Sequence, residues 1–415
     1  MFSAFRESDY RRFWTAQFIS NVGGWMQAVA QGWLVYRLTD SPFLLGFVGF
    51  AATAPAIVLM LPGGVLADQL DRRRVIAISQ WAQAGSALWL AIAIATNHIG
   101  VWQIIGAALV VGIAQSFSAP AYQAMVLDLL DDRSRLPNAI AMNSLQFNLS
   151  RAVGPLLASI TLASWGTFWC FFLNALSFLP LIFVLGRTTK RQQYDEQAGE
   201  IFARMREGMR YVYQDRLVLL LLCAAAAGSL FGYPYFALMP VLARKLFLDD
   251  AAGNGYLIGA VGAGALVAAL TLSMVTPKRM LRMIILTTAL FGLALGAVGF
   301  VDDRRAVMGF LVLCGVGMVT SLALCNTLIQ QRTPDAMRGR VMSMYTFTWF
   351  AFTPFGNLMA GILAEQRGIG LTFVVLGAGL VITAIGVASF GLRMSRRVVE
   401  STSRQAEIVL DDSST

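Results

Sequence analysis

Charged residues are rare in this 415-residue chain, and one cluster of them separates two long apolar runs. The segment GGVLADQLDRRR, residues 63–74, holds two aspartates and three arginines. Asp68 lies where the first run ends, so its carboxylate can face the positive N-terminus of another helix or pair with the arginines. The segment therefore predicts a contact that holds helices together. The alternative is that the arginines only anchor the turn at the membrane surface, but an aspartate adds nothing to a purely basic anchor.

Arg151 is the other notable charge, because it lies in the middle of an apolar run, residues 138–162. A cation inside a membrane is costly and is functional by default. We expect Arg151 to bind an anionic or oxygen-rich solute, or to hold a polar network with Gln146, Asn148 or neighbouring helices. All 23 aspartates and glutamates lie in connectors, tails or run ends, so no acidic residue is expected at mid-membrane to carry protons.

The composition indicates what positions these residues. The chain is 57% hydrophobic and 13% charged, whereas soluble domains carry about 25% charged residues. Apolar runs long enough to cross a hydrocarbon core of about 30 Å recur throughout, and they are too long for barrel strands. We predict an all-α integral membrane protein with about twelve transmembrane helices in two pseudo-symmetric six-helix bundles. The predicted spans are residues 13–36, 43–67, 75–96, 101–127, 138–162, 167–186, 217–243, 253–275, 281–301, 306–331, 341–364 and 370–392.

A polar connector with a helical pattern divides the chain into two halves. The predicted parts are a first bundle (1–186), a cytoplasmic linker (187–216), a second bundle (217–392) and a cytoplasmic tail (393–415) that we expect to be disordered. The halves echo each other, since GPLLAS at 154–159 is matched by GNLMAG at 356–361. Such weak repetition is typical of transporters whose substrate site lies between the halves.

The distribution of basic residues predicts the orientation. Of the 32 lysines and arginines, 25 lie in the chain ends and alternate connectors, and 6 lie in the intervening connectors. The positive-inside rule therefore places both termini in the cytoplasm. The net charge of +9 reflects this topology in a lipid bilayer and not a nucleic-acid surface.

Metal, disulfide and enzymatic chemistry find no support in the sequence. The four cysteines lie in apolar runs without a CxxC pair, and the one histidine, His98, lies in a loop. Neither an HExxH motif nor paired membrane aspartates are present. We therefore expect no metal, no cofactor and no enzymatic activity.

The charged turn resembles the signature of the major facilitator superfamily, in which glycine and leucine-alanine-aspartate precede a basic cluster. Gln69 and Asp71 depart from it, since arginine and glycine are usual there. The resemblance implies a latch in which Asp68 meets the start of the eleventh span, and which holds the halves together when the cavity faces outward. The predicted latch residues are Gly64, Asp68, Arg72, Arg73, Asp128, Arg338 and Arg340.

The fifth span carries SRAVGPLLAS, residues 150–159, which resembles the antiporter motif of efflux members of this superfamily. Small residues at four-residue spacing let helices pack closely, and proline removes a backbone hydrogen bond and favours a kink. The motif favours export over import; ordinary helix packing is the alternative. Its residues are Ser150, Gly154, Pro155, Ala158 and Ser159.

Polar and aromatic side chains recur on single faces of the first, fourth and seventh spans, which line the cavity in this superfamily together with the tenth. They suit a mixed polar and aromatic solute, unless they serve interhelical hydrogen bonds. The cavity candidates are Gln17, Asn21, Gln31, Gln115, Ser118, Tyr122, Arg151, Ser229, Tyr233 and Phe236, with Ser321 and Cys325 on the tenth span.

Two further stretches, residues 207–212 and 332–341, resemble the exporter branch that includes the bacterial enterobactin exporter, the transmembrane secretion effector family. The resemblance implies a secondary active transporter in the bacterial cytoplasmic (inner) membrane that exports a small secondary metabolite, first of all a siderophore, by alternating access. The alternative is a multidrug or macrolide efflux pump. We expect a monomer driven by the proton-motive force, with handover to periplasmic or outer-membrane export components.

Overall fold

The computed structural model describes residues 3–188, 201–247, 251–272, 276 and 279–412. Within these ranges, the backbone but not the side chain is described at residues 61, 65, 67, 68, 133, 201–205, 251, 252, 335, 336 and 392–412. The described part of the chain is helical and contains no strand.

The first half contains the six predicted spans, two of which are interrupted. Pro55 and Pro180 have no N–H for the helical ladder, so the second span is split at Ala54 and the sixth at Phe178. After a short turn η1 (Ser3–Arg6), the helices are α1 (Ser8–Thr39), α2 (Pro42–Thr53), α3 (Pro55–Gln69), α4 (Arg72–Ala95), α5 (Val101–Asp128), η2 (Arg133–Arg135), α6 (Leu136–Ser164), α7 (Thr167–Ser177) and α8 (Leu179–Arg187).

The second half begins with a linker helix, and its first span is irregular. The seventh span passes from α10 through one π-helical turn, η4, and a 3-10 turn, η5, into α11; Pro234 opens η5. The elements are α9 (Ile201–Gln214), α10 (Arg216–Ala227), η4 (Gly228–Gly232), η5 (Pro234–Phe236), α11 (Met239–Phe247), α12 (Ala251–Leu272), α13 (Met280–Val298), α14 (Arg304–Arg332), α15 (Asp335–Arg367) and α16 (Ile369–Asp412).

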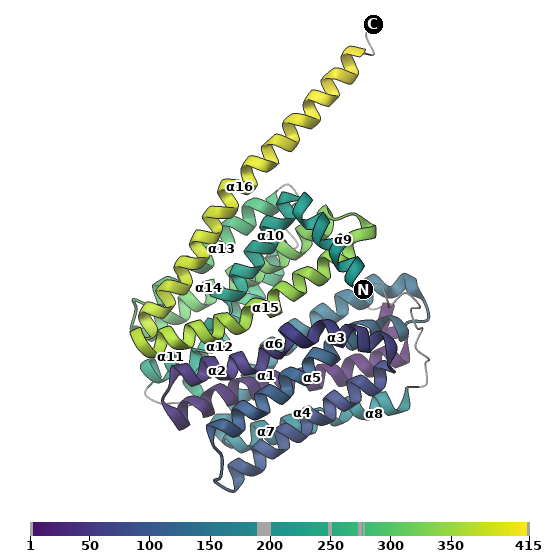
Figure 1. Cartoon of the computed structure of the whole chain (residues 1–415). Coiled ribbons are helices and arrows are strands. Elements are labelled where there is room, and N and C mark those ends of the chain that lie inside the picture. Colours follow the sequence, from purple (N-terminus) through teal and green to yellow (C-terminus); the bar gives the residue numbers. More distant parts are fainter. Residues whose placement is uncertain (1–2, 189–200, 248–250, 273–275, 277–278, 413–415) are drawn as a thin grey trace.

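The expectation of a disordered tail was wrong over residues 393–412. Helix α16 is continuous for 44 residues and projects away from the bundle (Figure 1). The segment is polar but contains neither glycine nor proline, and arginine, glutamate, glutamine and alanine propagate a helix well once it has begun.

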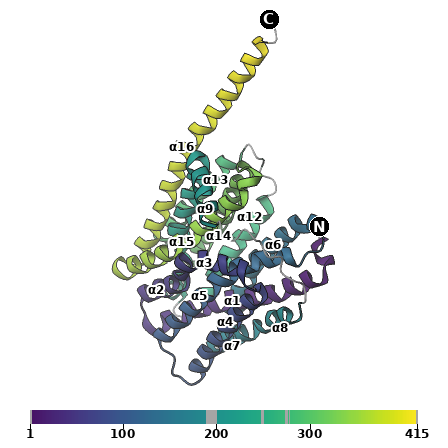
Figure 2. The same ribbon diagram turned by 45° about the vertical axis from the view of Figure 1, so that its right-hand side comes forward.

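Ten segments of the described chain are long and apolar enough to cross a membrane. The other two predicted spans, α1 and α6, are helices of 32 and 29 residues. They are less apolar because they carry several amides and Arg151. The prediction of an all-α membrane protein with two six-span bundles is therefore confirmed, and the first bundle lies below the second in Figures 1 and 2.

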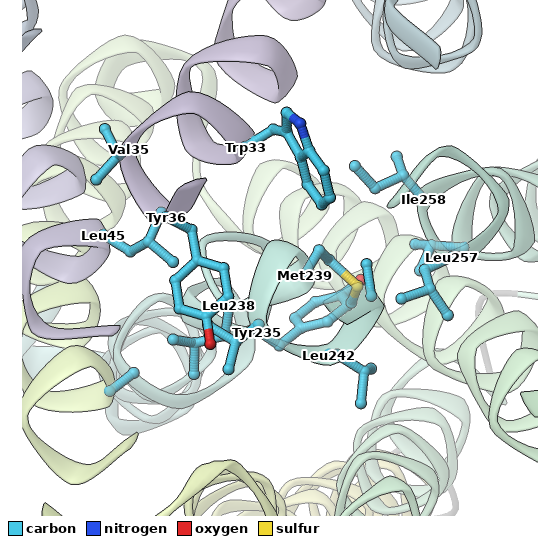
Figure 3. Packing of buried hydrophobic residues seen from close by; sticks show 14 of the residues in the cluster. Trp33, Val35, Tyr36, Leu45, Tyr235, Leu238, Met239, Leu242, Leu257 and Ile258 are labelled. Atoms are coloured by element: carbon cyan, nitrogen blue, oxygen red, sulfur yellow. The ribbon is translucent and has the colours of Figure 1, made fainter. Parts of the chain in front are cut away.

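The two halves share a hydrophobic core at one end of the bundle only, as far as the described residues go. We call this the Asp40 end, after the turn that joins α1 to α2, and we call the opposite one the Arg72 end. The shared cluster joins Trp33 and Tyr36 of α1 to Tyr235, Met239 and Ile258 of the second half (Figure 3). At the Arg72 end, one cluster belongs to the first half and another to the second. The halves are thus packed together at the Asp40 end and keep separate cores at the Arg72 end.

Candidate functional site

Arg151 lies where the two halves meet, midway along α6. Its guanidinium carbon is 5.9 Å from the ring centre of Trp25 on α1 and 5.2 Å from that of Phe236 in η5. Its Nη2 atom is 3.4 Å from the sulfur of Met318 on α14. Cations are attracted to aromatic faces at this distance. One half-buried side chain therefore contacts the first, seventh and tenth spans together.

No carboxylate neutralises Arg151 among the described side chains, since none of the ion pairs found there includes it. The network expected with Gln146 and Asn148 is not formed. Gln146 instead donates to the Trp14 carbonyl at 2.8 Å, and Asn148 donates to the Ser144 carbonyl one turn away. Arg151 is thus a half-buried cation held by ring faces and a sulfur atom, with hydrogen-bonding capacity left for another group.

An aromatic cluster and a small pocket extend from Arg151 into the second half. Tyr233 meets Trp349 of α15 edge-on, with ring centres 5.9 Å apart, and Phe236 at 6.0 Å. The pocket shares Trp349 with this cluster and Met318 with the contacts of Arg151, and Ser321 and Cys325 of the tenth span also line it. Its other lining residues are Ala224, Ala225, Gly228, Thr288, Phe291, Leu322 and Leu380. The π-helical turn η4 begins at Gly228, and such turns are frequent at functional sites.

Several polar cavity candidates form hydrogen bonds within their own half; the bonds of Gln115 and Tyr122 join two helices, whereas those of Gln17 and Ser229 stay within one span. Gln17 donates to Asn21 at 3.0 Å, and Gln115 donates to the buried Gln83 at 3.1 Å. Tyr122 donates to Gln146, and Ser229 donates to the Ala225 carbonyl. Ser118 is buried, whereas Gln31 is half-buried. The structure therefore gathers Arg151, Tyr233 and Phe236 into one cluster and distributes the remaining candidates over the first half and η4.

The predicted motif on α6 makes close contacts on two faces. A Cβ atom at Gly154 would lie 2.5 Å from that of Trp25, so glycine is required where α6 crosses α1. On another face, Ser159 contacts Gly255 of α12 in the other half. Ala158 and Ser150 are fully buried, and the Ser150 hydroxyl has no hydrogen-bond partner among the described residues. Helix α6 continues through Pro155 to Ser164.

At the Arg72 end, the structure joins two predicted latch residues within the first half. Arg72 binds both carboxylate oxygens of Asp128, at 2.8 and 3.0 Å, and both side chains are largely buried. Asp71, which stands where glycine is usual, caps the N-terminus of α4 by accepting from the Arg73 N–H at 3.0 Å. The Arg73 guanidinium also binds this carboxylate at 2.8 Å and lowers the pKa of Asp71 below its ordinary value.

Among the bonds of the second-half latch residues, one goes to the linker and one stays within their own half. Arg340 pairs with Glu207 of α9, and Arg338 donates to the Gln330 carbonyl at 3.2 Å. The Asp68 side chain lies outside the described ones, so its predicted contact is untested. No described atom lies within 4 Å of a Cβ built at Gly64, whereas a Cβ at Gly63 would lie 2.5 Å from the Ser116 carbonyl oxygen. Gly63 is therefore the glycine that permits close approach here, to α5.

Sequence reasoning missed the contacts that join the halves at the Asp40 end. Arg244 of α11 pairs with Asp40 at 2.5 Å. Glu365 of α15 accepts hydrogen bonds from the Ser41 hydroxyl and the Phe43 N–H. The sequence carries two signals of these contacts. Glu365 is a carboxylate at the end of one apolar run, and Ser41-Pro42, which follows another apolar run, is a typical helix start.

Comparisons of the chain with known proteins give a consistent result. The model of a family described as transmembrane secretion effectors matches residues 1–411. The chain is 26% identical to the staphyloferrin A transporter of Staphylococcus aureus, over 88% of this chain and 92% of that one. It is 26% identical to the multidrug efflux pump Tap of Mycolicibacterium fortuitum, over 89% and 92%. It is 25% identical to the enterobactin exporter EntS of Shigella flexneri, over 92% and 93%.

Solved structures share the fold at low sequence identity. A variant of the nucleoside transporter NupG superposes with a TM-score of 0.74 at 11% identity, over 92% of this chain and 99% of that one. A bacterial homologue of the lysosomal transporter Spinster, inward-facing and unoccupied, superposes with a TM-score of 0.71 at 13% identity, over 92% and 96%.

Proposed function

Because the chain belongs to the transmembrane secretion effector family of the major facilitator superfamily, we propose that this multi-pass efflux transporter exports an anionic siderophore from a bacterial cell. Two relatives are named for siderophores, staphyloferrin A and enterobactin, and both are matched over nearly their whole length. The proposal places the protein in the cytoplasmic membrane as a monomeric transporter that performs no catalysis. Handover to periplasmic or outer-membrane components would complete export.

The observation that carries the anionic substrate class is the unneutralised Arg151. Its guanidinium contacts both halves, through Trp25 on one side and Phe236 and Met318 on the other. A planar guanidinium presents donors in a fork that matches carboxylates and similar oxygen pairs. An anion bound there would be held by both halves at once, which is the arrangement that alternating access needs.

The packing of the halves supports a state in which substrate can enter from the cytoplasm. Basic residues gather at the Arg72 end, so the positive-inside rule makes that end cytoplasmic. The shared core then closes the outer face, while the separate cores leave the halves unpacked on the inner face. Substrate would reach Arg151 from the cytoplasm in this state.

Energy coupling is proposed to use the proton-motive force without a cofactor. Asp128 is the carboxylate best placed for it in the described chain, because it is largely buried against Arg72 at the inner edge.

A second candidate function is multidrug efflux. The aromatic cluster of Tyr233, Phe236 and Trp349 favours it, because ring faces bind flat apolar solutes without requiring charge. The relationship to Tap agrees with it equally well.

A deletion strain and its parent, grown under iron limitation, distinguish the two functions. We expect mass spectrometry to find an iron-chelating metabolite retained in the mutant cells and depleted from their medium, with recovery when the gene is restored. Unchanged secretion together with drug hypersensitivity of the mutant would contradict siderophore export and support multidrug efflux.

A further inference from the structure

The turn between α1 and α2 is held by residues of the other half. Asp40 ends α1 in the left-handed region, with φ of 54°, and Ser41 caps α2 by accepting from the Leu44 N–H. Pro42 occupies the first position of α2 and has no N–H to satisfy. The first free donor of this helix start is therefore the Phe43 N–H.

Glu365 supplies the partner of that donor from the end of α15. Its Oε2 atom accepts from the Phe43 N–H at 3.1 Å and from the Ser41 hydroxyl at 2.9 Å. The first N–H groups of a helix have no partner within it, and the positive end of the helix favours a carboxylate. The start of α2 is thus completed by the second half.

A second contact from the other half reaches the same turn. Arg244, in the last turn of α11, pairs with Asp40 at 2.5 Å. Its guanidinium carbon lies 5.5 Å from the ring centre of Tyr36, one turn before Asp40 on α1. Below the turn, the backbones of α2 and α15 approach at Gly46 and Gly361, where a Cβ on Gly46 would lie 2.9 Å from the Gly361 Cα.

From these contacts we propose that Glu365 and Arg244 form an outer lock on residues 40–43, which keeps the Asp40 end closed in this state and releases when that end opens. It is the counterpart of the predicted latch at the other end of the same helix pair. A carboxylate of α15 meets the start of α2 here, whereas the latch would bring Asp68, near the end of α3, to the start of α15. Glu365 is a positioning residue in this scheme.

The exposure of the lock suits a contact that breaks in every cycle. Glu365 is exposed, and the side chains of Arg244 and Asp40 are 39% and 64% exposed. Ion pairs in water contribute little, and the groups released on opening are hydrated at once. The lock therefore biases the equilibrium between the two states without trapping either one.

Spin labels on the purified protein test the lock without any substrate. Cys223, the exposed one of the four cysteines, is first replaced by serine. One labelled pair, His98→Cys with Arg305→Cys, reports the distance between the halves at the Asp40 end. A second pair, Ser134→Cys with Gln331→Cys, reports the Arg72 end. All four positions are exposed.

Glu365→Ala should raise the ratio of molecules with a long outer distance to those with a short one, about three- to tenfold for the loss of one charged partner at a helix start. The inner distance should shorten in the same molecules. Glu365→Gln, which keeps an acceptor, should have a smaller effect, and Gln366→Ala, the neighbouring exposed residue, should have none. Asp40→Asn, which tolerates the left-handed backbone, should lengthen the outer distance independently.

Outer distances that stay at the wild-type distribution in Glu365→Ala and Asp40→Asn would overturn the outer lock. The outer lock rests on the proposed function only in one respect: a transporter needs one state with the Asp40 end closed and another with it open. A protein that exports no siderophore would still show the shift in distances, so the two ideas fail separately.

Discussion

Replacing Arg151 by methionine should separate the stability of this protein from its activity. Methionine is unbranched, flexible and apolar, so it can follow the path of the arginine stem toward Trp25, Phe236 and Met318, although it ends short of the guanidinium. The change removes two cation–π contacts, worth about 0.5–2 kcal/mol each. It also removes the cost of a cation inside the membrane, about 2.5–3.5 kcal/mol by insertion scales. These terms nearly cancel, so we expect normal membrane insertion and a melting temperature equal to or above that of the wild type.

Transport should respond differently, because methionine cannot bind an anion. A hydrogen bond between charged partners contributes about 1.5–3 kcal/mol, which corresponds to roughly 10- to 150-fold weaker binding. The assay is accumulation, in inverted membrane vesicles, of the metabolite that the deletion strain retains. Arg151→Lys should be intermediate, since it keeps the charge and loses the planar fork. Met318→Leu, which removes the sulfur contact and leaves the cation, is the matched control and should transport normally.

Wild-type accumulation by Arg151→Met would refute substrate binding by Arg151. A parallel fall in melting temperature and transport would also refute the reasoning, because it would make Arg151 a structural residue. Loss of transport in Met318→Leu would show that packing around the cation, and not its charge, matters.

Three further changes test the packing and the Arg72 end. Gly154→Val should destabilise the protein by about 1–3 kcal/mol through overpacking against Trp25, seen as a lower melting temperature in detergent. Gly85→Ala, at an open position, should leave the melting temperature unchanged. Equal melting temperatures of the two variants would show that α1 and α6 can separate at Gly154 without cost. Arg72→Gln should lower the stability of the fold by about 3–5 kcal/mol, because it leaves the largely buried Asp128 without its cation. Adding Asp128→Asn should recover part of that stability. A double variant no more stable than Arg72→Gln would mean that the two residues act independently. Asp71→Ala should cost about 1 kcal/mol through the lost N-cap of α4, seen as a lower melting temperature; an unchanged melting temperature would show that the cap contributes nothing.

Hydropathy and charge placement were sufficient to predict the spans, their order and the division into halves, because membrane helices must be long and apolar. The breaks at Ala54 and Phe178 follow from prolines and could have been located. The extension of α16 was missed because its polar composition was weighed above its helix propensity. The π-helical turn η4 lies against Phe291 and Trp349, and no local sequence pattern shows that these distant residues pack there.

Candidate site residues could be predicted where the residue type differs from its neighbours in the sequence. They could not be predicted where the contact is made by residues of distant helices. Arg151 was found because it is a charge inside an apolar run, and Gly154 because small residues repeat around it. Trp25 and Met318 lie on two other spans, and only the packed structure brings them to Arg151. Glu207 and Glu365 resembled ordinary solvated carboxylates, because nothing in a single sequence shows that Arg340 or the start of α2 lies opposite.

Arg151, a cation without an acidic partner among the described side chains, also has an electrical consequence. If the site faces the two sides in turn, the empty carrier moves one positive charge through part of the membrane potential, and the carrier loaded with a monoanion moves none. A full crossing is worth about 2.3 kcal/mol per 100 mV. With a negative interior, the voltage would draw the empty site back toward the cytoplasm, so the resetting step of the cycle would be driven by membrane potential even though the loaded step is electroneutral.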